Sequence, residues 1–167
     1  MTDGNIILTG MPGSGKSTVG VILAKELCMD FVDTDVLIQL GEGMALQDVY
    51  DRYGADGFLD VEERYVGGLT VSRTVIAPGG SVVLNDSLME NLKASGIVVF
   101  LDVPIGVITP RIDLLSRGTV RKPGETLEDV WRVREPLYRR YADITVECGA
   151  MDQREIARSI AGKAGIR

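Results

Sequence analysis

The chain has 167 residues, of which 45% are hydrophobic and 25% charged, a composition typical of a soluble globular domain. Its net charge of −6 argues against a general nucleic-acid or membrane-surface binder. The chain has no histidine, and its two cysteines, Cys28 and Cys148, form no Cys-x-x-Cys pair. These counts exclude or disfavour a zinc site, a histidine-based triad and a histidine general base.

Several features predict a cytoplasmic protein. Residues 1–9 lack the basic start and the long apolar stretch of a signal peptide. The most apolar run, 97–110, is too short and too interrupted to span a bilayer. Both cysteines are expected to be reduced thiols. We therefore expect one domain over 1–167, a monomer, with no nucleic-acid or membrane partner.

Taken from the start of the chain, 5–9 is a short apolar run that predicts a strand, and 19–27 has apolar residues at helical spacing. Between them, residues 10–18 read Gly-Met-Pro-Gly-Ser-Gly-Lys-Ser-Thr, which matches the phosphate-binding P-loop pattern. Strand, glycine loop and helix form the context that this motif requires. The alternative is a glycine-rich turn that binds no ligand.

The chemistry of such a loop follows from its backbone. Gly13 and Gly15 can adopt positive φ, so that the loop amides point inward at an anion beside a helix N-terminus. Lys16 would reach the β- and γ-phosphates of a nucleotide, and the Ser17 hydroxyl would ligate Mg²⁺.

The remaining elements alternate between strands and helices. We predict five strands, at 5–9, 31–33, 74–77, 97–101 and 144–147. Helical patterns cover 36–40, 45–53, 56–69, 87–94, the start of 104–111, 127–141 and 153–164. The segment 126–129 resembles a capping box at the start of its helix, and 114–125 is read as a basic loop. This alternation predicts an α/β domain with a parallel sheet.

A pair of carboxylates, Asp33 and Asp35, follows the second predicted strand. If this segment is extended, both side chains project to one side. One could hold Mg²⁺, mostly through water, and the other could accept a proton from an attacking hydroxyl. The alternative is that an Asp here caps a helix.

At this point the chain resembles the shikimate kinase family over nearly its whole length. The resemblance lies in the glycine loop at 10–18, Phe-Val-Asp-Thr-Asp at 31–35, Gly-x-x-x-Phe-x-x-x-Glu at 54–62, Pro-Gly-Gly at 78–80, Arg-Gly-Thr-Val-Arg at 117–121 and Arg-Glu-Pro-Leu-Tyr at 134–138. It implies a three-layer P-loop kinase fold, with a five-stranded parallel sheet flanked by helices and a lid at about 112–124. It also implies transfer of the γ-phosphate of ATP to shikimate, a step of aromatic amino acid biosynthesis.

The resemblance further implies roles for individual residues. Lys16, Asp35 and Arg121 would be catalytic, and Ser17 and Asp33 would serve the Mg²⁺. ATP would contact Gly13, Ser14, Gly15, Lys16, Ser17, Thr18, Arg121 and Arg117, the last two being alternatives for the lid arginine. The anionic acceptor would contact Asp35, Glu62, Gly79, Gly80 and Arg134.

Leu59 is the main departure from the family pattern. Most members have an arginine at this position, which holds the acceptor carboxylate together with the arginine that corresponds to Arg134. Pro78 in place of a family glycine and Lys122 in the lid are further differences. A kinase of the same fold with another hydroxy acid, polyol or amino alcohol therefore stays open, as does an ATP-binding regulatory module. A nucleoside monophosphate kinase is disfavoured, since the Asp pair suits a neutral hydroxyl better.

Overall fold

The computed structural model describes residues 4–111 and 119–165. Its centre is a five-stranded sheet in the order β2-β3-β1-β4-β5, with every neighbouring pair parallel. The strands are β1 (Asn5–Thr9), β2 (Asp30–Asp33), β3 (Thr74–Ala77), β4 (Gly96–Asp102) and β5 (Ile144–Glu147). The five predicted strands are confirmed, and their ends shift by one residue at most.

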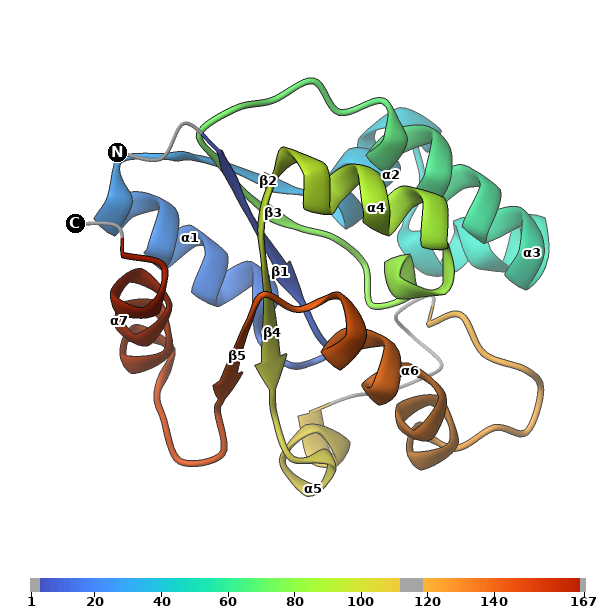
Figure 1. The fold of residues 1–167 in the computed structure, drawn as a ribbon. Helices are drawn as coiled ribbons and strands as arrows, with labels where there is room; N and C mark the ends of the chain where they lie inside the picture. Colours follow the sequence, from blue (N-terminus) through green and yellow to red (C-terminus); the bar gives the residue numbers. More distant parts are fainter. Residues whose placement is uncertain (1–3, 112–118, 166–167) are drawn as a thin grey trace.

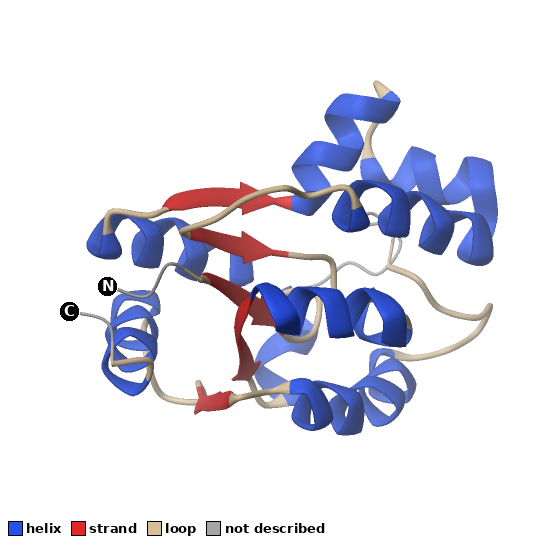
Figure 2. Cartoon of the chain, turned by 45° about the horizontal axis from the view of Figure 1, so that its top comes forward, coloured by secondary structure: helices blue, strands red, loops and turns tan. Residues whose placement is uncertain are grey.

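Helices cover both faces of this sheet. They are α1 (Lys16–Leu27), α2 (Thr34–Glu42), α3 (Leu46–Gly67), α4 (Asp86–Ser95), α5 (Ile105–Ile108), α6 (Leu127–Tyr141) and α7 (Gln153–Lys163), with 3₁₀ turns at Val82–Leu84 and Thr109–Arg111. In Figure 1, α1 and α7 lie on one face and α4 and α6 on the other, and Figure 2 shows strands between helices. The predicted three-layer fold is therefore confirmed.

The sheet is buried because helices cover it on both sides. Every residue of β1 and β3 is buried, which suits the nearly unbroken apolar sequences of these strands. Side chains from β1, β3 and β4 form the main hydrophobic core with the inner faces of α1, α4, α6 and α7.

The strand order places a crevice at the carboxyl end of β1. The chain leaves β1 toward β2 on one side, returns through β3 and then crosses to β4 on the other side. In open parallel sheets, ligands bind where the connections diverge in this way.

The region of α2 and α3 differs from the sequence prediction. Helix α2 begins at Thr34, two residues before the predicted start, and runs through Glu42 to a left-handed Gly43 with φ 67°. Helix α3 joins two segments that were predicted as separate helices. They meet at Gly54, whose φ of 70° and ψ of −176° kink the helix without an intervening loop.

A second hydrophobic cluster holds α2 against α3. Its buried members are Ile38, Val49, Phe58, Val61 and Val120, so it also takes in the chain that leads toward α6. The cluster gives the α2–α3 region its own packing, beside the main core of the sheet.

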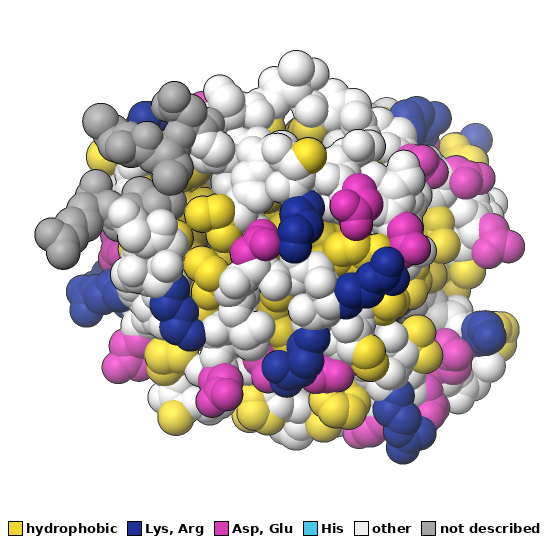
Figure 3. All heavy atoms as spheres, viewed as in Figure 1, with side chains coloured by type: hydrophobic (Ala, Val, Ile, Leu, Met, Phe, Trp, Pro, Cys, Tyr) yellow, Lys and Arg dark blue, Asp and Glu magenta, His cyan; other side chains and the backbone are white. Residues whose placement is uncertain are grey.

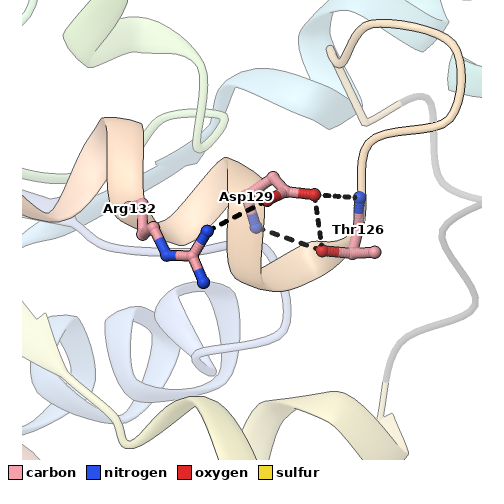
Figure 4. Close-up of polar contacts among 3 residues, drawn as sticks. All are labelled: Thr126, Asp129 and Arg132. Carbon is pink, nitrogen blue, oxygen red and sulfur yellow. Dashed lines mark hydrogen bonds and ion pairs between the residues drawn. The ribbon is translucent and has the colours of Figure 1, made fainter.

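The predicted capping box at the start of α6 is confirmed (Figure 4). The Thr126 hydroxyl accepts the backbone N–H of Asp129 at 3.2 Å, and the Asp129 carboxylate accepts the N–H of Thr126 at 3.0 Å. Arg132 adds an ion pair to Asp129 at 3.3 Å. These contacts satisfy backbone donors in the first turn and fix where the preceding chain enters the helix.

Two surface observations bear on partners. On the face shown in Figure 3, basic and acidic side chains are interspersed. Among the residues that the structure describes, no helix combines the length and apolar character that a membrane span needs.

Candidate active site

The glycine loop between β1 and α1 has the predicted backbone geometry. Gly13 has φ 76° and Gly15 has φ 91°, so both lie in the left-handed region that glycine adopts at little cost. Gly15 is the N-cap of α1, and the N–H of Ser14 donates to the carbonyl of Met11 at 3.1 Å. The loop therefore curls over the start of α1, where free backbone amides favour an anion.

This loop forms one wall of a cavity of about 540 Å³. The other walls come from the ends of β2 and β3, from α3 and from the chain before α6. Predicted site residues that line it are Gly13, Gly15, Lys16, Ser17, Thr18, Asp33, Asp35, Gly79, Gly80 and Arg134. Segments from Pro12 to Gln153 thus meet in a single cavity, as the strand order requires.

Of the predicted residues that the structure describes, three do not line the cavity. Ser14 is buried within the loop, and its hydroxyl has no partner among the described residues. Glu62 lies behind Gly79, while the Arg121 side chain donates to the Glu125 carbonyl at 3.4 Å. Arg117 falls outside the described residues, as does most of the predicted lid.

Lys16 projects from the first turn of α1 into the loop. Its Nζ donates to the carbonyls of Gly10 at 2.8 Å and Met11 at 3.0 Å. Burial lowers its pKa to about 8, against the raising effect of Asp35 and Asp33. Lys16 belongs to none of the ion pairs found among the described residues, so its charge is available to an anion in the cavity.

Asp33 and Asp35 are not held in one extended segment, because α2 starts between them. Asp33 is the N-cap of α2, and its Oδ1 accepts the N–H groups of Asp35 at 3.0 Å and Val36 at 3.4 Å. The capping reading of the sequence is therefore confirmed for Asp33. Both carboxylates nevertheless line the cavity, Asp35 from the first turn of the helix.

Gly79 and Gly80 bring the two sides of the cavity into contact. A Cβ on Gly79 would lie 2.5 Å from Glu62 Oε1 and 3.1 Å from Asp35 Oδ1. A Cβ on Gly80 would lie 2.7 Å from the Pro12 ring of the glycine loop. A side chain at Gly79 would therefore displace the two carboxylates, and a side chain at Gly80 would displace the glycine loop.

Arg134 is buried, at 3% exposure, yet it lines the cavity. Its guanidinium donates to the Val120 carbonyl, and its charge acts to lower the pKa of Tyr138. Tyr138 in turn donates to the Gly80 carbonyl at 2.6 Å, and burial raises its pKa to about 12. Since Arg134 forms none of the ion pairs among the described residues, it is suited to pair with a carboxylate of a ligand.

Glu62 is 1% exposed and accepts a hydrogen bond from the Ser81 hydroxyl at 2.9 Å. Burial raises its pKa to about 7, the Ser81 hydrogen bond opposes this rise, and nearby Asp35 adds to it. Leu59, three residues earlier, packs against the second hydrophobic cluster. Glu62 is thus held by a serine.

The raised pKa of Glu62 predicts a stability that depends on pH. Between about pH 4.5 and 7 the unfolded chain carries an ionised Glu62 and the folded chain a protonated one. Folding then takes up a proton, so the wild type loses stability as the pH rises through this window. The glutamine of Glu62→Gln does not titrate. The free energy of unfolding of this variant, relative to the wild type, should therefore rise by about 3 kcal/mol between pH 4.5 and 7.

Urea denaturation of both proteins across this window measures the effect. Glu63→Gln removes an exposed carboxylate from the neighbouring position and serves as the control. Equal pH dependence for the two variants would contradict the buried state of Glu62.

Several residues of the site carry no sequence motif that could have revealed them. Arg111, Gln153 and Leu46 line the cavity, while Tyr50 and Ser81 position others through hydrogen bonds. Phe58 and Tyr138 belong to the family motifs, but no role was predicted for either: Phe58 lines the cavity and Tyr138 donates to the Gly80 carbonyl. The partners of the remaining residues are set by tertiary packing.

Comparison with known proteins agrees with this geometry. The model of the shikimate kinase family matches residues 12–164. A shikimate kinase of Thermodesulfovibrio yellowstonii is 35% identical over 160 residues, covering 93% of this chain and 92% of the relative. One from Haemophilus influenzae is 37% identical over 147 residues, which cover 85% of this chain and 82% of the relative.

Solved structures show the same similarity. The shikimate kinase of Acinetobacter baumannii, solved in complex with shikimate, superposes with a TM-score of 0.90 at 32% identity, covering 97% of this chain and 93% of that one. The enzyme of Aquifex aeolicus superposes with a TM-score of 0.80 at 30% identity, with 93% of each chain covered. Together with the glycine loop, the aspartates and Arg134 in one cavity, these matches show that the chain belongs to the shikimate kinase family.

Proposed function

We propose that this protein transfers the γ-phosphate of ATP to a hydroxyl of shikimate, giving shikimate 3-phosphate and ADP. One observation carries the proposal: the glycine loop, Asp35 and Arg134 line the same cavity. The donor, a proton acceptor and an anion-binding group can therefore act on one acceptor molecule. The similar Acinetobacter baumannii enzyme, which was solved with shikimate, supports the choice of acceptor.

On the donor side, the amides of the glycine loop and Lys16 would bind the β- and γ-phosphates. Ser17 and Asp33 would hold a magnesium ion, which when bound neutralises phosphate charge. The residues fit this ion: both line the cavity, and only Oδ1 of the Asp33 carboxylate is engaged in capping α2. Magnesium takes few protein carboxylates and keeps waters and phosphate oxygens as its other ligands.

On the acceptor side, Arg134 would bind the carboxylate of the acceptor, and the hydrogen bond to the Val120 carbonyl would hold the guanidinium in place. Asp35 would orient the attacking hydroxyl and take up its proton as the oxygen bonds to the γ-phosphorus. The bond between that phosphorus and the bridging oxygen breaks, and ADP leaves. Such transfer depends mainly on positioning and electrostatics.

Leu59 favours a second candidate, a kinase of the same fold with another small hydroxylated acceptor. Leu59 cannot form the charged contact to the acceptor carboxylate that an arginine makes at this position in most family members. Here its side chain packs against the second hydrophobic cluster. The missing charge-assisted contact is worth about 1.5–3 kcal/mol, or roughly a tenfold to hundredfold in affinity. Glu62 also has Ser81 beside it instead of that arginine.

An acceptor panel tests the proposal. Purified protein with ATP and Mg²⁺ would be given shikimate, other hydroxy acids, polyols and amino alcohols, with ADP release followed enzymatically and product identified by mass spectrometry. We expect the highest kcat/KM with shikimate. Transfer only to another acceptor would overturn the shikimate assignment and leave the kinase assignment standing, whereas nucleotide binding without any product would favour a regulatory module.

A further inference from the structure

Tyr50, on the first half of α3, contacts the chain that carries Arg121. Its hydroxyl donates to the backbone carbonyl of Arg121 at 2.9 Å, across 71 residues of sequence. The Tyr50 ring packs against the second hydrophobic cluster, 6.0 Å from the ring of Phe58. The ring thus holds Tyr50 in place, and its hydroxyl makes one specific contact to the lid segment.

The preceding residue, Val120, is anchored on the same side. Its side chain is a buried member of the second cluster, and its carbonyl accepts a hydrogen bond from Arg134. Two successive carbonyls, those of Val120 and Arg121, are therefore fixed from the acceptor side of the cavity. Arg134, which would bind the acceptor carboxylate, and Tyr50 of α3 thus hold the same short stretch of chain.

The other end of this stretch is also fixed. The N–H of Lys122 donates to the Glu125 carboxylate at 2.7 Å, and the capping box begins at Thr126 (Figure 4). By comparison, the guanidinium of Arg121 makes a long contact of 3.4 Å to the Glu125 carbonyl. The backbone around Arg121 is thus well anchored and its side chain is weakly held, so the side chain can rotate toward the cavity from a fixed Cα.

We propose that Tyr50 is a positioning residue for Arg121, one that holds the backbone of this arginine so that its guanidinium can reach the phosphates of the nucleotide. This inference rests on the proposed function, in which Arg121 offsets charge on the transferred phosphoryl group. The anchor limits the freedom that Arg121 loses when its side chain engages the phosphates. Because Tyr50 and Val120 belong to the acceptor side of the cavity, this anchor also links the acceptor side to the phosphates on the donor side.

A double-mutant cycle tests the inference. Tyr50→Phe keeps the ring and its packing and removes only the hydroxyl. With Arg121 present, we expect kcat to fall about three- to tenfold with little change in the KM of the acceptor, since one neutral hydrogen bond is lost. In the Arg121→Ala background, the same change should have no further effect.

The matched control is Tyr53→Phe, on the same helix. The Tyr53 hydroxyl donates to Glu42 at 3.2 Å, and it has no hydrogen bond to the described part of the lid segment, 119–124. Wild-type kinetics are expected for this variant.

Each outcome of the cycle decides the inference. Loss of the Tyr50→Phe effect in the Arg121→Ala background supports it. An equal reduction in both backgrounds, or no reduction with Arg121 present, overturns it, because Tyr50 would then act on packing alone or not at all.

A second readout separates this inference from the proposed function. The same four proteins are titrated with a non-hydrolysable ATP analogue and with ADP. If the wild type phosphorylates no acceptor, the proposed function fails, and the positioning role is still decided by whether Tyr50→Phe weakens binding of the analogue only when Arg121 is present.

Discussion

Replacing Asp35 with asparagine is expected to lower turnover at least about 10²-fold while nucleotide affinity stays nearly unchanged. Asparagine has almost the same size and can still orient a hydroxyl, but it cannot accept the proton. Asp35 lines the same cavity as the glycine loop, from the first turn of α2, and its carboxylate lies against Gly79. Steady-state kinetics with saturating acceptor and calorimetric titration with ADP·Mg²⁺ measure the two quantities.

Asp33→Asn provides a sharp control for this result. Asparagine caps helices about as well as aspartate, so α2 should keep its start and the two backbone N–H groups their acceptor. We expect this variant to need more Mg²⁺ for the same rate, since its effect falls on the metal. If Asp35→Asn instead weakened nucleotide binding with little loss of turnover, Asp35 would serve the metal and not the proton.

The donor half of the site could be predicted from the sequence because it is local. The glycine loop lies within nine residues, and the positive φ angles at Gly13 and Gly15 follow from residue type. Strand ends were also predictable, since apolar runs identify buried parallel strands and all five carboxyl ends meet at one edge. The cavity appears where that reasoning places it.

The acceptor half depends on contacts between distant positions and could be predicted only in part. The family pattern pointed to Arg134 and Glu62, but the hydrogen bond from Ser81 to Glu62 and that from Tyr138 to Gly80 follow from packing alone. The start of α2 between Asp33 and Asp35 was missed because a strand end and a helix cap share the same residue.

Arg121 shows a further limit of the sequence. A motif can indicate that an arginine belongs to the lid segment, yet its side chain lies against Glu125 and does not line the cavity. Its distance from a phosphate depends on how the chain before α6 is held. That chain is held by Tyr50, Arg134 and the second cluster, contacts that no local pattern encodes.

The second large effect is expected at Lys16, where Lys16→Ala should lower phosphotransfer by roughly 10³-fold or more. The ammonium is held by the neutral carbonyls of Gly10 and Met11, at 2.8 and 3.0 Å. Neutral acceptors form no ion pair with it, so an incoming phosphate gains a charge interaction in a buried setting. In Lys16→Ala, the negative charge that spreads over the phosphoryl oxygens during transfer would no longer be stabilised by the Lys16 ammonium.

Folding of the variant must be separated from its chemistry, since Lys16 is buried at 9% exposure. Lys16→Met keeps most of the side-chain volume and removes the charge, and Lys25→Ala removes an exposed lysine from the last turn of the same helix. We expect Lys16→Met to fold and to be as inactive as Lys16→Ala, and Lys25→Ala to retain activity. Because burial already lowers the pKa of Lys16 to about 8, its charge is costly to the folded state, and removing it should cost little stability. Near-normal turnover in a folded Lys16→Met protein would contradict the assignment of the glycine loop as the phosphate-binding element.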